Sequence, residues 1–289
     1  MNEPHLNPSH RPICFVGGGN MAAAIVQGLV ATGYPADLIQ VVEPALAQRD
    51  HLNTAIPGLV VHDSAATIDC DVEAIVLAVK PQITQLVCGQ IAARYKTSGA
   101  AIPTIISVAA GIRTTDIGRW LDHSGGIIRV MPNQGAMVGL GSAGMFATAE
   151  TSDAGKTIAA ALMGAVGDAI WVDSEAAIDS VTAVSGSGPA YFFLLMETMQ
   201  STAESLGLSP DVARKLVVGT ATGAAKLASE NADLAGLRRA VTSPGGTTAA
   251  AINHMLAQKL DVIVGDAMRN AKARAAELAD EAATGDTPE

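Results

Sequence analysis

The sequence predicts an N-terminal α/β domain with a parallel sheet, followed by an all-α C-terminal domain. Up to about residue 172, short apolar segments alternate with segments of helical periodicity, a pattern typical of βαβ units with helices on both faces of a sheet. Beyond that point, long Ala-rich stretches follow with no segment that favours a strand. The chain has 289 residues, which is enough for two domains with cores of their own.

Each expected strand of the first domain is a short apolar segment, separated from the next by a helical pattern. The strands are predicted at residues 13–16, 38–43, 72–79, 104–110 and 125–131. The helices between them are predicted from residue 22 to a C-terminal Gly33, and at residues 45–52, 83–93 and 115–121. Residues 142–148 and 168–172 could add strands at the edge of the sheet.

The second domain is expected to contain helices only. Gly207 can close one of its helices, and Ser209 with Pro210 supplies an N-cap and a first-turn proline for the next. The helices are expected on either side of an interruption at Ser185–Gly188, at residues 211–228, and from a Ser-Pro-Gly-Gly block to about residue 282. The predicted organisation is a flexible leader at 1–12, the α/β domain at 13–172, the helical domain at 173–282 and a disordered tail at 283–289.

Composition and charge exclude several classes of function. A net charge of −10 argues against nucleic acid as a partner, and no apolar run is long enough for a membrane span. Three cysteines without a CxxC pair indicate a reducing compartment, so we expect a cytoplasmic protein. The six histidines are scattered, which predicts no metal site, and the polar, Pro-punctuated leader does not resemble a signal peptide.

Two expected helices of the second domain are apolar on more than one face, at residues 191–199 and 213–228. A helical domain of this size would leave such faces in water unless another surface covers them. The faces could pack on the first domain, but a homodimer through these helices explains them better.

A glycine-rich turn joins the first strand to the first helix. Gly17 permits a tight turn, Gly19 permits close approach of a pyrophosphate, and Ala22 lets the helix pack on the strand. The backbone amides that open the helix, with Asn20 and Met21 in its first turn, would face the phosphate charge. The strand-turn-helix context makes this a Rossmann-type dinucleotide-binding signature rather than a plain Gly-rich turn.

Two further strand ends are assigned to the cofactor site. Glu43 ends the second strand, where a carboxylate can accept bonds from the adenosine ribose and would repel a 2′-phosphate, so it favours NADH slightly over NADPH. Arg49 lies close enough to reach a phosphate, and Glu43 could also be only a solvated strand end. Residues 78–81 (Ala78, Val79, Lys80 and Pro81) follow the most apolar strand, at the edge where the crevice of an open α/β sheet lies.

Five motifs together resemble one family. "ICFVGGGNMA", "LAVKPQ", "RVMPN", "AVSGSGPAYFF" and "LRRAVTSPGGTT" occur in the order seen in pyrroline-5-carboxylate reductases, from about Ile13 to Leu278. The resemblance implies a dinucleotide-binding domain with an all-helical dimerisation domain, which in some members assembles further into rings of dimers. It implies NAD(P)H-dependent reduction of the cyclic imine 1-pyrroline-5-carboxylate to L-proline. It also places Asn133, in the "MPN" motif, at the cofactor site.

The resemblance assigns the substrate to the block Ser243–Thr248. Backbone N–H groups of Gly245, Gly246 and Thr247 would receive the substrate carboxylate at a helix N-terminus. Thr248 would bond to the imine nitrogen and is the one residue assigned a catalytic role. Ser243 would cap the helix or touch the substrate. A turn with a helix cap and no ligand would explain the block only in part.

Ser185 is placed near the substrate by the same resemblance, although Ser185–Gly188 could equally be a turn between helices. Two departures from the family pattern are Gln134-Gly135 after "MPN", where Thr-Pro is common, and the segment "LRRAV" before the Ser-Pro-Gly-Gly block. The first could alter the floor of the nicotinamide site. The second could alter dimer contacts or substrate preference.

Other functions remain open on the sequence. The chain could reduce another cyclic imine, or it could be a dinucleotide-binding regulatory protein with weak turnover, which only the changed "MPNQG" stretch favours. A relative of the β-hydroxyacid dehydrogenases would need a lysine on a long interdomain helix. Lys215 and Lys226 lie on expected helices but have no Gly-rich surroundings that suggest a site.

Overall fold

The computed structural model describes residues 11–284. Most of the predicted leader and tail, residues 1–10 and 285–289, lies outside the described residues. The chain forms two compact units: the first runs to Ser187 and takes in the chain again from Ala271, and the second is Gly188–Asn270. These units do not follow the boundary expected at residue 172, because helix α6 (Ala177–Val181) packs on the sheet of the first unit.

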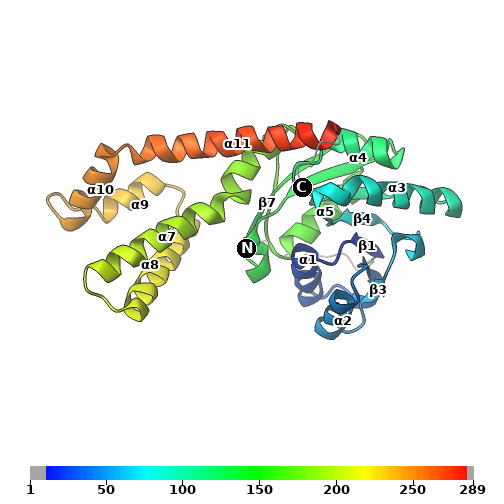
Figure 1. The fold of residues 1–289 in the computed structure, drawn as a ribbon, viewed down its shortest axis with the longest axis horizontal. Coiled ribbons are helices and arrows are strands. Elements are labelled where there is room, and N and C mark those ends of the chain that lie inside the picture. Colours follow the sequence, from blue (N-terminus) through cyan, green and yellow to red (C-terminus); the bar gives the residue numbers. More distant parts are fainter. Residues whose placement is uncertain (1–10, 285–289) are drawn as a thin grey trace. The chain divides into compact units, whose positions relative to one another are not determined.

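The first unit contains a single eight-stranded sheet in the order β3-β2-β1-β4-β5-β6-β7-β8 (Figure 1). All neighbours are parallel except β6 and β7, which are antiparallel. The strands are β1 Ile13–Val16, β2 Ile39–Val42, β3 Val60–His62, β4 Ala74–Leu77, β5 Thr104–Ser107, β6 Ile127–Met131, β7 Gly141–Ala147 and β8 Gly167–Trp171. The predicted parallel sheet is confirmed and both edge strands are present, whereas β3 was not predicted.

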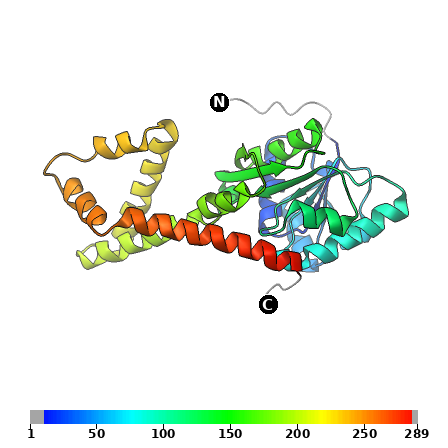
Figure 2. The ribbon, with the colours of Figure 1, turned by 90° about the horizontal axis from the view of Figure 1, so that it is seen from above.

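Helices cover both faces of this sheet (Figure 2). They are α1 Asn20–Ala31, α2 Leu46–Ala55, α3 Pro81–Ser98, α4 Thr114–Leu121, α5 Asp153–Gly164 and α6. Side chains alternate along β1, so that Phe15 joins one core with Leu29 of α1, and Cys14 joins the other with Ile91 of α3. Burial on both faces explains why the parallel strands are apolar throughout rather than alternating with polar residues.

The predicted end of the first helix is confirmed in detail. Gly33 has φ +95°, its N–H donates to Val30 O at 3.0 Å, and the Tyr34 N–H donates to Leu29 O at 3.0 Å. This pair of bonds is the Schellman motif, which needs a left-handed residue where glycine has no steric penalty. Gly207 ends α7 in the same way with φ +98°.

The second unit is built only from helices, and no strand lies beyond Trp171 in the described chain. The helices are α7 Gly188–Ser205, α8 Pro210–Glu230, α9 Leu234–Ala240, α10 Thr247–Ala257 and the first part of α11 Leu260–Thr284. The single helix expected after the Ser-Pro-Gly-Gly block is in fact two, because the chain breaks at Lys259 with φ +59°. None of the helices in residues 11–284 is long and apolar enough to cross a membrane.

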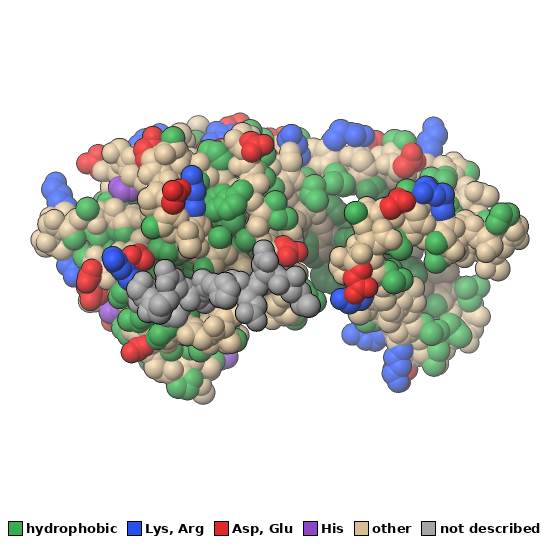
Figure 3. Space-filling view, turned by 180° about the vertical axis from the view of Figure 1, so that it is seen from behind, with side chains coloured by type: hydrophobic (Ala, Val, Ile, Leu, Met, Phe, Trp, Pro, Cys, Tyr) green, Lys and Arg blue, Asp and Glu red, His purple; other side chains and the backbone are tan. Residues whose placement is uncertain are grey.

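The second unit buries almost no hydrophobic side chain by itself. Among its described hydrophobic residues only Ala213 and Val217 are buried, while Phe192 is 67% and Leu194 64% exposed. Hydrophobic side chains are accordingly exposed at the surface of this unit (Figure 3). A domain without its own core needs another apolar surface to be stable, which is the physical basis for self-association.

A buried ion cluster attaches α6 to the sheet. Arg129 of β6 is 3% exposed, and its guanidinium lies 3.4 Å from Glu175 Oε1 and 3.4 Å from Asp179 Oδ1. Glu175 also accepts bonds from the Thr114 N–H at 2.7 Å and the Thr114 hydroxyl at 2.8 Å. Every carboxylate of the cluster therefore has a partner, as buried charges require.

Replacement of Arg129 by leucine should lower the free energy of unfolding by about 3 kcal/mol or more, because two partly buried carboxylates lose their cation. Denaturant unfolding of the variant measures this loss. The matched control is Arg269→Leu, which removes an exposed ion pair with Asp266 and should change stability little. Equal effects of the two substitutions would contradict a structural role for the buried cluster.

Candidate functional site

The glycine turn after β1 lies directly against the end of β4. Gly17 has φ +103°, and a Cβ atom there would lie 2.5 Å from the carbonyl oxygen of Ala78. The Gly17 N–H donates to Val42 O of β2 at 2.8 Å, and the Ala78 N–H donates to Val16 O at 2.9 Å. The turn predicted at Gly17 is therefore present, and only glycine satisfies both its dihedral angle and its space.

The N-terminus of α1 is open. Gly19 is the N-cap, and no side chain within the described residues caps this end. A Cβ atom at Gly19 would meet nothing within 4 Å, so no other part of the chain crowds this N-cap position. The first intrahelical bond runs from the Ala23 N–H to Gly19 O, which leaves the amides of Asn20, Met21 and Ala22 without a helical acceptor. Such an end attracts anions.

Two side chains form hydrogen bonds with the backbone of Gly18, one with its N–H and the other with its carbonyl oxygen. Glu43 Oε2 accepts a bond from the Gly18 N–H at 3.0 Å, and Gln48 Nε2 donates to Gly18 O at 2.6 Å. The turn is therefore fixed before any ligand binds. Gln48 was not predicted, since it lies 30 residues from Gly18 and only the pairing of β1 with β2 brings α2 to the turn.

Glu43 lies where the sequence predicted, at the end of β2, but its oxygens already have backbone partners. Oε1 accepts a bond from the Ala45 N–H at 2.9 Å, and Oε2 accepts the bond from Gly18. Each carboxylate oxygen has a second lone pair, which leaves room for a ribose hydroxyl. Arg49 Nη1 donates to Glu43 O at 3.0 Å and Pro44 O at 2.7 Å, so its guanidinium holds the turn after β2.

The predicted residues at the end of β4 lie beside the glycine turn. Val79 Cγ1 is 3.0 Å from the position of a Cβ on Gly17, and Lys80 is the exposed N-cap of α3 with Pro81 in its first turn. β1 and β4 are the neighbours between which the order of the sheet reverses. In open α/β sheets the ligand crevice lies at this point, so the structure brings Gly17, Gly19 and Lys80 to one edge.

Asn133 and Ser185, assigned to different ligands by the sequence, are bonded to each other. Asn133 Nδ2 donates to Ser185 O at 3.1 Å, and its Oδ1 accepts bonds from the N–H groups of Gly135 and Ser142. The expected interruption at Ser185–Gly188 is not a turn: residues Thr182–Gly186 form a π-helical segment directly after α6. The Ser185 hydroxyl donates to Val181 O at 3.1 Å.

The block Ser243–Thr248 lies in the helical unit and forms a turn followed by a helix. The Gly246 N–H donates to Ser243 O at 3.0 Å, and Gly245 at the third position has φ +73°. With Pro244 at the second position this is a type II turn. The N-cap of α10 is Gly246, with no side-chain cap, so the expected cap by the Ser243 hydroxyl is absent.

The turn changes which amides of the block are available. Because the Gly246 N–H is used inside the turn, it is not free for a carboxylate, contrary to the prediction from the sequence. The first intrahelical bond reaches from Ala250 to Gly246, so the amides of Thr247 and Thr248 open the helix. Thr247 is exposed and Thr248 half-buried.

Comparison with known proteins places the whole chain in one family. Pyrroline-5-carboxylate reductase of Pseudomonas aeruginosa is 43% identical over 270 residues, which are 93% of this chain and 97% of that relative. The chain belongs to the pyrroline-5-carboxylate reductase family. A family model described as pyrroline-5-carboxylate reductase dimerisation matches residues 175–278, and one described as NADP oxidoreductase, coenzyme F420-dependent, matches residues 12–111.

Solved structures of pyrroline-5-carboxylate reductases share the fold. The enzyme from Coxiella burnetii has 38% identity and a TM-score of 0.87 over 93% of this chain and 99% of that chain. The enzyme from Plasmodium falciparum, crystallised with NADP bound, has 23% identity and a TM-score of 0.79 over 93% and 98% of the two chains. The predicted two-part architecture is thereby confirmed.

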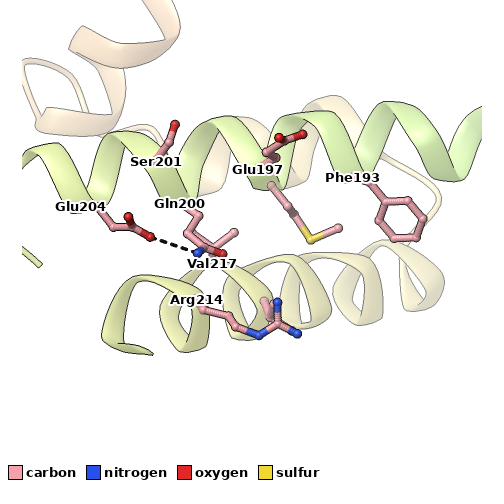
Figure 4. A pocket seen from close by; sticks show the side chains of 9 residues that line it. Phe193, Glu197, Gln200, Ser201, Glu204, Arg214 and Val217 are labelled. Atoms are coloured by element: carbon pink, nitrogen blue, oxygen red, sulfur yellow. Dashed lines mark hydrogen bonds between the residues drawn. The ribbon is translucent and has the colours of Figure 1, made fainter. Parts of the chain in front are cut away.

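The dimerisation part of this reductase-family chain carries a groove between α7 and α8 (Figure 4). Its cavity volume is about 620 Å³, and its lining includes Phe193, Arg214 and Val217. Gln200 Nε2 donates to Glu204 Oε1 at 3.0 Å along the wall formed by α7. None of the predicted site residues lines this groove.

Side chains for nucleophilic or metal chemistry do not gather at the carboxyl edge of the sheet. Burial raises the pKa of the Cys14 and Cys88 thiols to about 12, so both stay protonated at neutral pH. In residues 11–284 no group of three or more His, Cys, Asp or Glu could hold a metal ion. The chemistry that the edge supports is binding and orientation.

Replacement of Gln48 by methionine should raise the Kd for the reduced dinucleotide about three- to tenfold, because the Gly18 carbonyl loses its donor and the turn is no longer fixed. Fluorescence titration of the bound nicotinamide measures this constant. Gln90→Met, on the exposed side of α3, is the matched control and should bind as the unaltered chain does. An unchanged Kd for Gln48→Met would show that the turn does not depend on this bond.

Proposed function

We propose that the chain reduces 1-pyrroline-5-carboxylate to L-proline with NAD(P)H, the final step of proline biosynthesis. The observation that carries the proposal is 43% sequence identity, over 93% of this chain, to a relative named for this reaction. The chain also keeps the glycine turn with an uncapped helix after it. The open N-termini of α1 and α10 suit the two anions involved, the cofactor pyrophosphate and the substrate carboxylate.

The residues of the glycine turn fit a dinucleotide. A Cβ position on Gly19 meets no other atom within 4 Å, and the amides of Asn20 and Met21 are without helical acceptors there. Glu43 lies on the β2 side of the turn, where the ribose of an adenosine would come, and Lys80 lies on the β4 side. When bound, the reduced nicotinamide supplies a hydride from its C4 atom.

The chain's part in the reaction is to bind and orient. Amides of Thr247 and Thr248 hold the substrate carboxylate, and the Thr248 hydroxyl orients the ring nitrogen by a hydrogen bond. A protonated imine is electrophilic at C5 without a nucleophile or a metal, so alignment lowers most of the barrier. Hydride addition at C5 turns the C=N bond into a C–N bond, and the nitrogen keeps its proton as an amine.

Purified protein should oxidise NADH or NADPH when racemic pyrroline-5-carboxylate is added, seen as loss of the reduced-nicotinamide absorbance. Turnover with either cofactor supports the proposal. Measurable cofactor binding without oxidation by this imine would instead favour another cyclic imine or a regulatory protein. We further propose a preference for NADH, because the Glu43 carboxylate would repel a 2′-phosphate.

Glu43→Gln should raise the ratio of kcat/KM for NADPH to that for NADH about fivefold, which corresponds to about 1 kcal/mol of charge repulsion. The substitution also weakens the bond to the Gly18 N–H, but that change affects both cofactors alike and cancels in the ratio. A constant ratio would show that Glu43 does not set cofactor preference.

Thr248→Ala should lower kcat/KM between about tenfold and a few hundredfold, as expected for the loss of one oriented hydrogen bond to the reacting group. The helix N-terminus stays in place, because alanine keeps the amide. Thr97→Ala, on the exposed face of α3, is the control for removal of a helical threonine hydroxyl. Full activity in Thr248→Ala would remove the threonine from the mechanism.

We infer that a second copy covers the exposed apolar faces of α7 and α8, with the groove at Phe193 and Arg214 inside the interface. Two observations support this inference. Residues 188–270 bury almost no hydrophobic side chain of their own, and the dimerisation model matches residues 175–278. Assembly of dimers into a ring and a cytoplasmic location are proposed with it, the latter because the three cysteines are free thiols.

A further inference from the structure

The π-helical segment Thr182–Gly186 is an unusual structure at the carboxyl edge of the sheet. The Ser187 N–H donates to Thr182 O at 2.8 Å, an i to i+5 bond. Such bonds are rare, and single π-helical turns of this kind are frequently found at functional sites. The contacts that hold this segment in place are therefore candidates for a role in the function of the site.

Two glycines let the end of α6 and the segment after it lie close to β7 and β6. A Cβ atom on Gly144 of β7 would lie 2.5 Å from Val181 Cγ2, and one on Gly186 would lie 2.6 Å from Met131 Cε of β6. The ion cluster of Arg129 holds α6, which leads into the segment. The segment is thus pressed against the end of β6.

The Asn133 side chain joins the loop after β6 to the segment. Its Nδ2 donates to Ser185 O at 3.1 Å. Its Oδ1 accepts bonds from the Gly135 N–H at 3.2 Å and the Ser142 N–H at 3.1 Å. One amide therefore joins three pieces of backbone: the loop after β6, the start of β7 and the π-helical segment.

These bonds leave the Asn133 side chain little capacity for a ligand. One amide proton is used by Ser185, and the oxygen has two donors already, which fills both lone pairs. The second amide proton has no acceptor among residues 11–284. A side chain committed in this way orients its neighbours rather than binding the cofactor itself.

The position of the π-helical segment at the edge of the sheet suggests why its orientation matters. β1, β4, β5 and β6 are parallel and end at the same edge. A dinucleotide whose pyrophosphate lies at the glycine turn extends from the β2 side across β4, so its nicotinamide half falls toward the ends of β5 and β6. The segment lies against Met131 at the end of β6, so it would border that half of a bound dinucleotide.

We propose that Asn133 is a positioning residue, which sets the π-helical segment for hydride transfer and is not a ligand of the cofactor. The proposal rests on the proposed reductase activity. Its signature is a loss of turnover without a loss of cofactor affinity, accompanied by loosening of residues 182–188. A cofactor ligand would change affinity, and a purely structural residue would change stability but not the turnover of folded protein.

The test is Asn133→Asp, which keeps size and both acceptor bonds but replaces the donor by an oxygen facing Ser185 O. We expect kcat to fall about tenfold and amide exchange in residues 182–188 to accelerate about tenfold, for the loss of one buried hydrogen bond. The Kd for NADH should stay within about twofold, since the glycine turn is untouched. Asn53→Asp, an exposed site on α2, controls for the added charge.

Unchanged kcat in Asn133→Asp, or a Kd that rises as much as kcat falls, would overturn the proposal. Cofactor binding and exchange need no turnover, so failure of the reductase assay in the unaltered chain would be seen separately. If the variant does not fold, amide hydrogen exchange in the unaltered chain tests the proposal instead. Residues 182–188 should be protected without NADH, and protection that appears only on adding NADH would contradict positioning by Asn133.

Discussion

The close approach of the Gly17 backbone to the end of β4 is the contact on which the rest of the site depends. A side chain at this position would overlap the Ala78 carbonyl, so any larger residue would push the turn away from the sheet. The approach lets α1 start directly over the carboxyl edge with its amides open. It also places the Gly18 peptide groups within reach of Glu43 and Gln48. The geometry of the turn and of the open helix start therefore depends on one glycine.

The stability of the helical unit depends on a different interaction, the burial of its apolar side chains. Its long helices leave Phe192, Leu194 and many other apolar side chains in water, and only two of its hydrophobic residues are buried. Hydrophobic burial is the main favourable term in folding, so this unit requires a surface beyond itself. The match to the dimerisation model supports the proposal that a second copy supplies that surface. The substrate block at Gly245 and Thr248 is carried by the same unit, which ties the proposed substrate site to assembly.

Local signals allowed much of this to be predicted. The glycine turn and the C-terminal glycines Gly33 and Gly207 were predictable because a dihedral angle or a cap requires a particular residue. The roles of Gln48 and Asn133 were not, since each depends on partners brought together by strand pairing. The short β3 has too few residues for a pattern, and the break at Lys259 has neither glycine nor proline to mark it. Capture of the Gly246 N–H inside the turn also required the observed geometry.

The central claim is that the chain aligns a reduced nicotinamide with a cyclic imine for direct hydride transfer. The most direct measurement uses NADH carrying deuterium at C4, with the product analysed for the position of the label. Direct transfer predicts one deuterium at C5 of proline when the label occupies the transferred face of the nicotinamide, and none when it occupies the other. Proline formed without label from both forms of labelled NADH, or with hydrogen drawn from solvent at C5, would contradict direct hydride transfer.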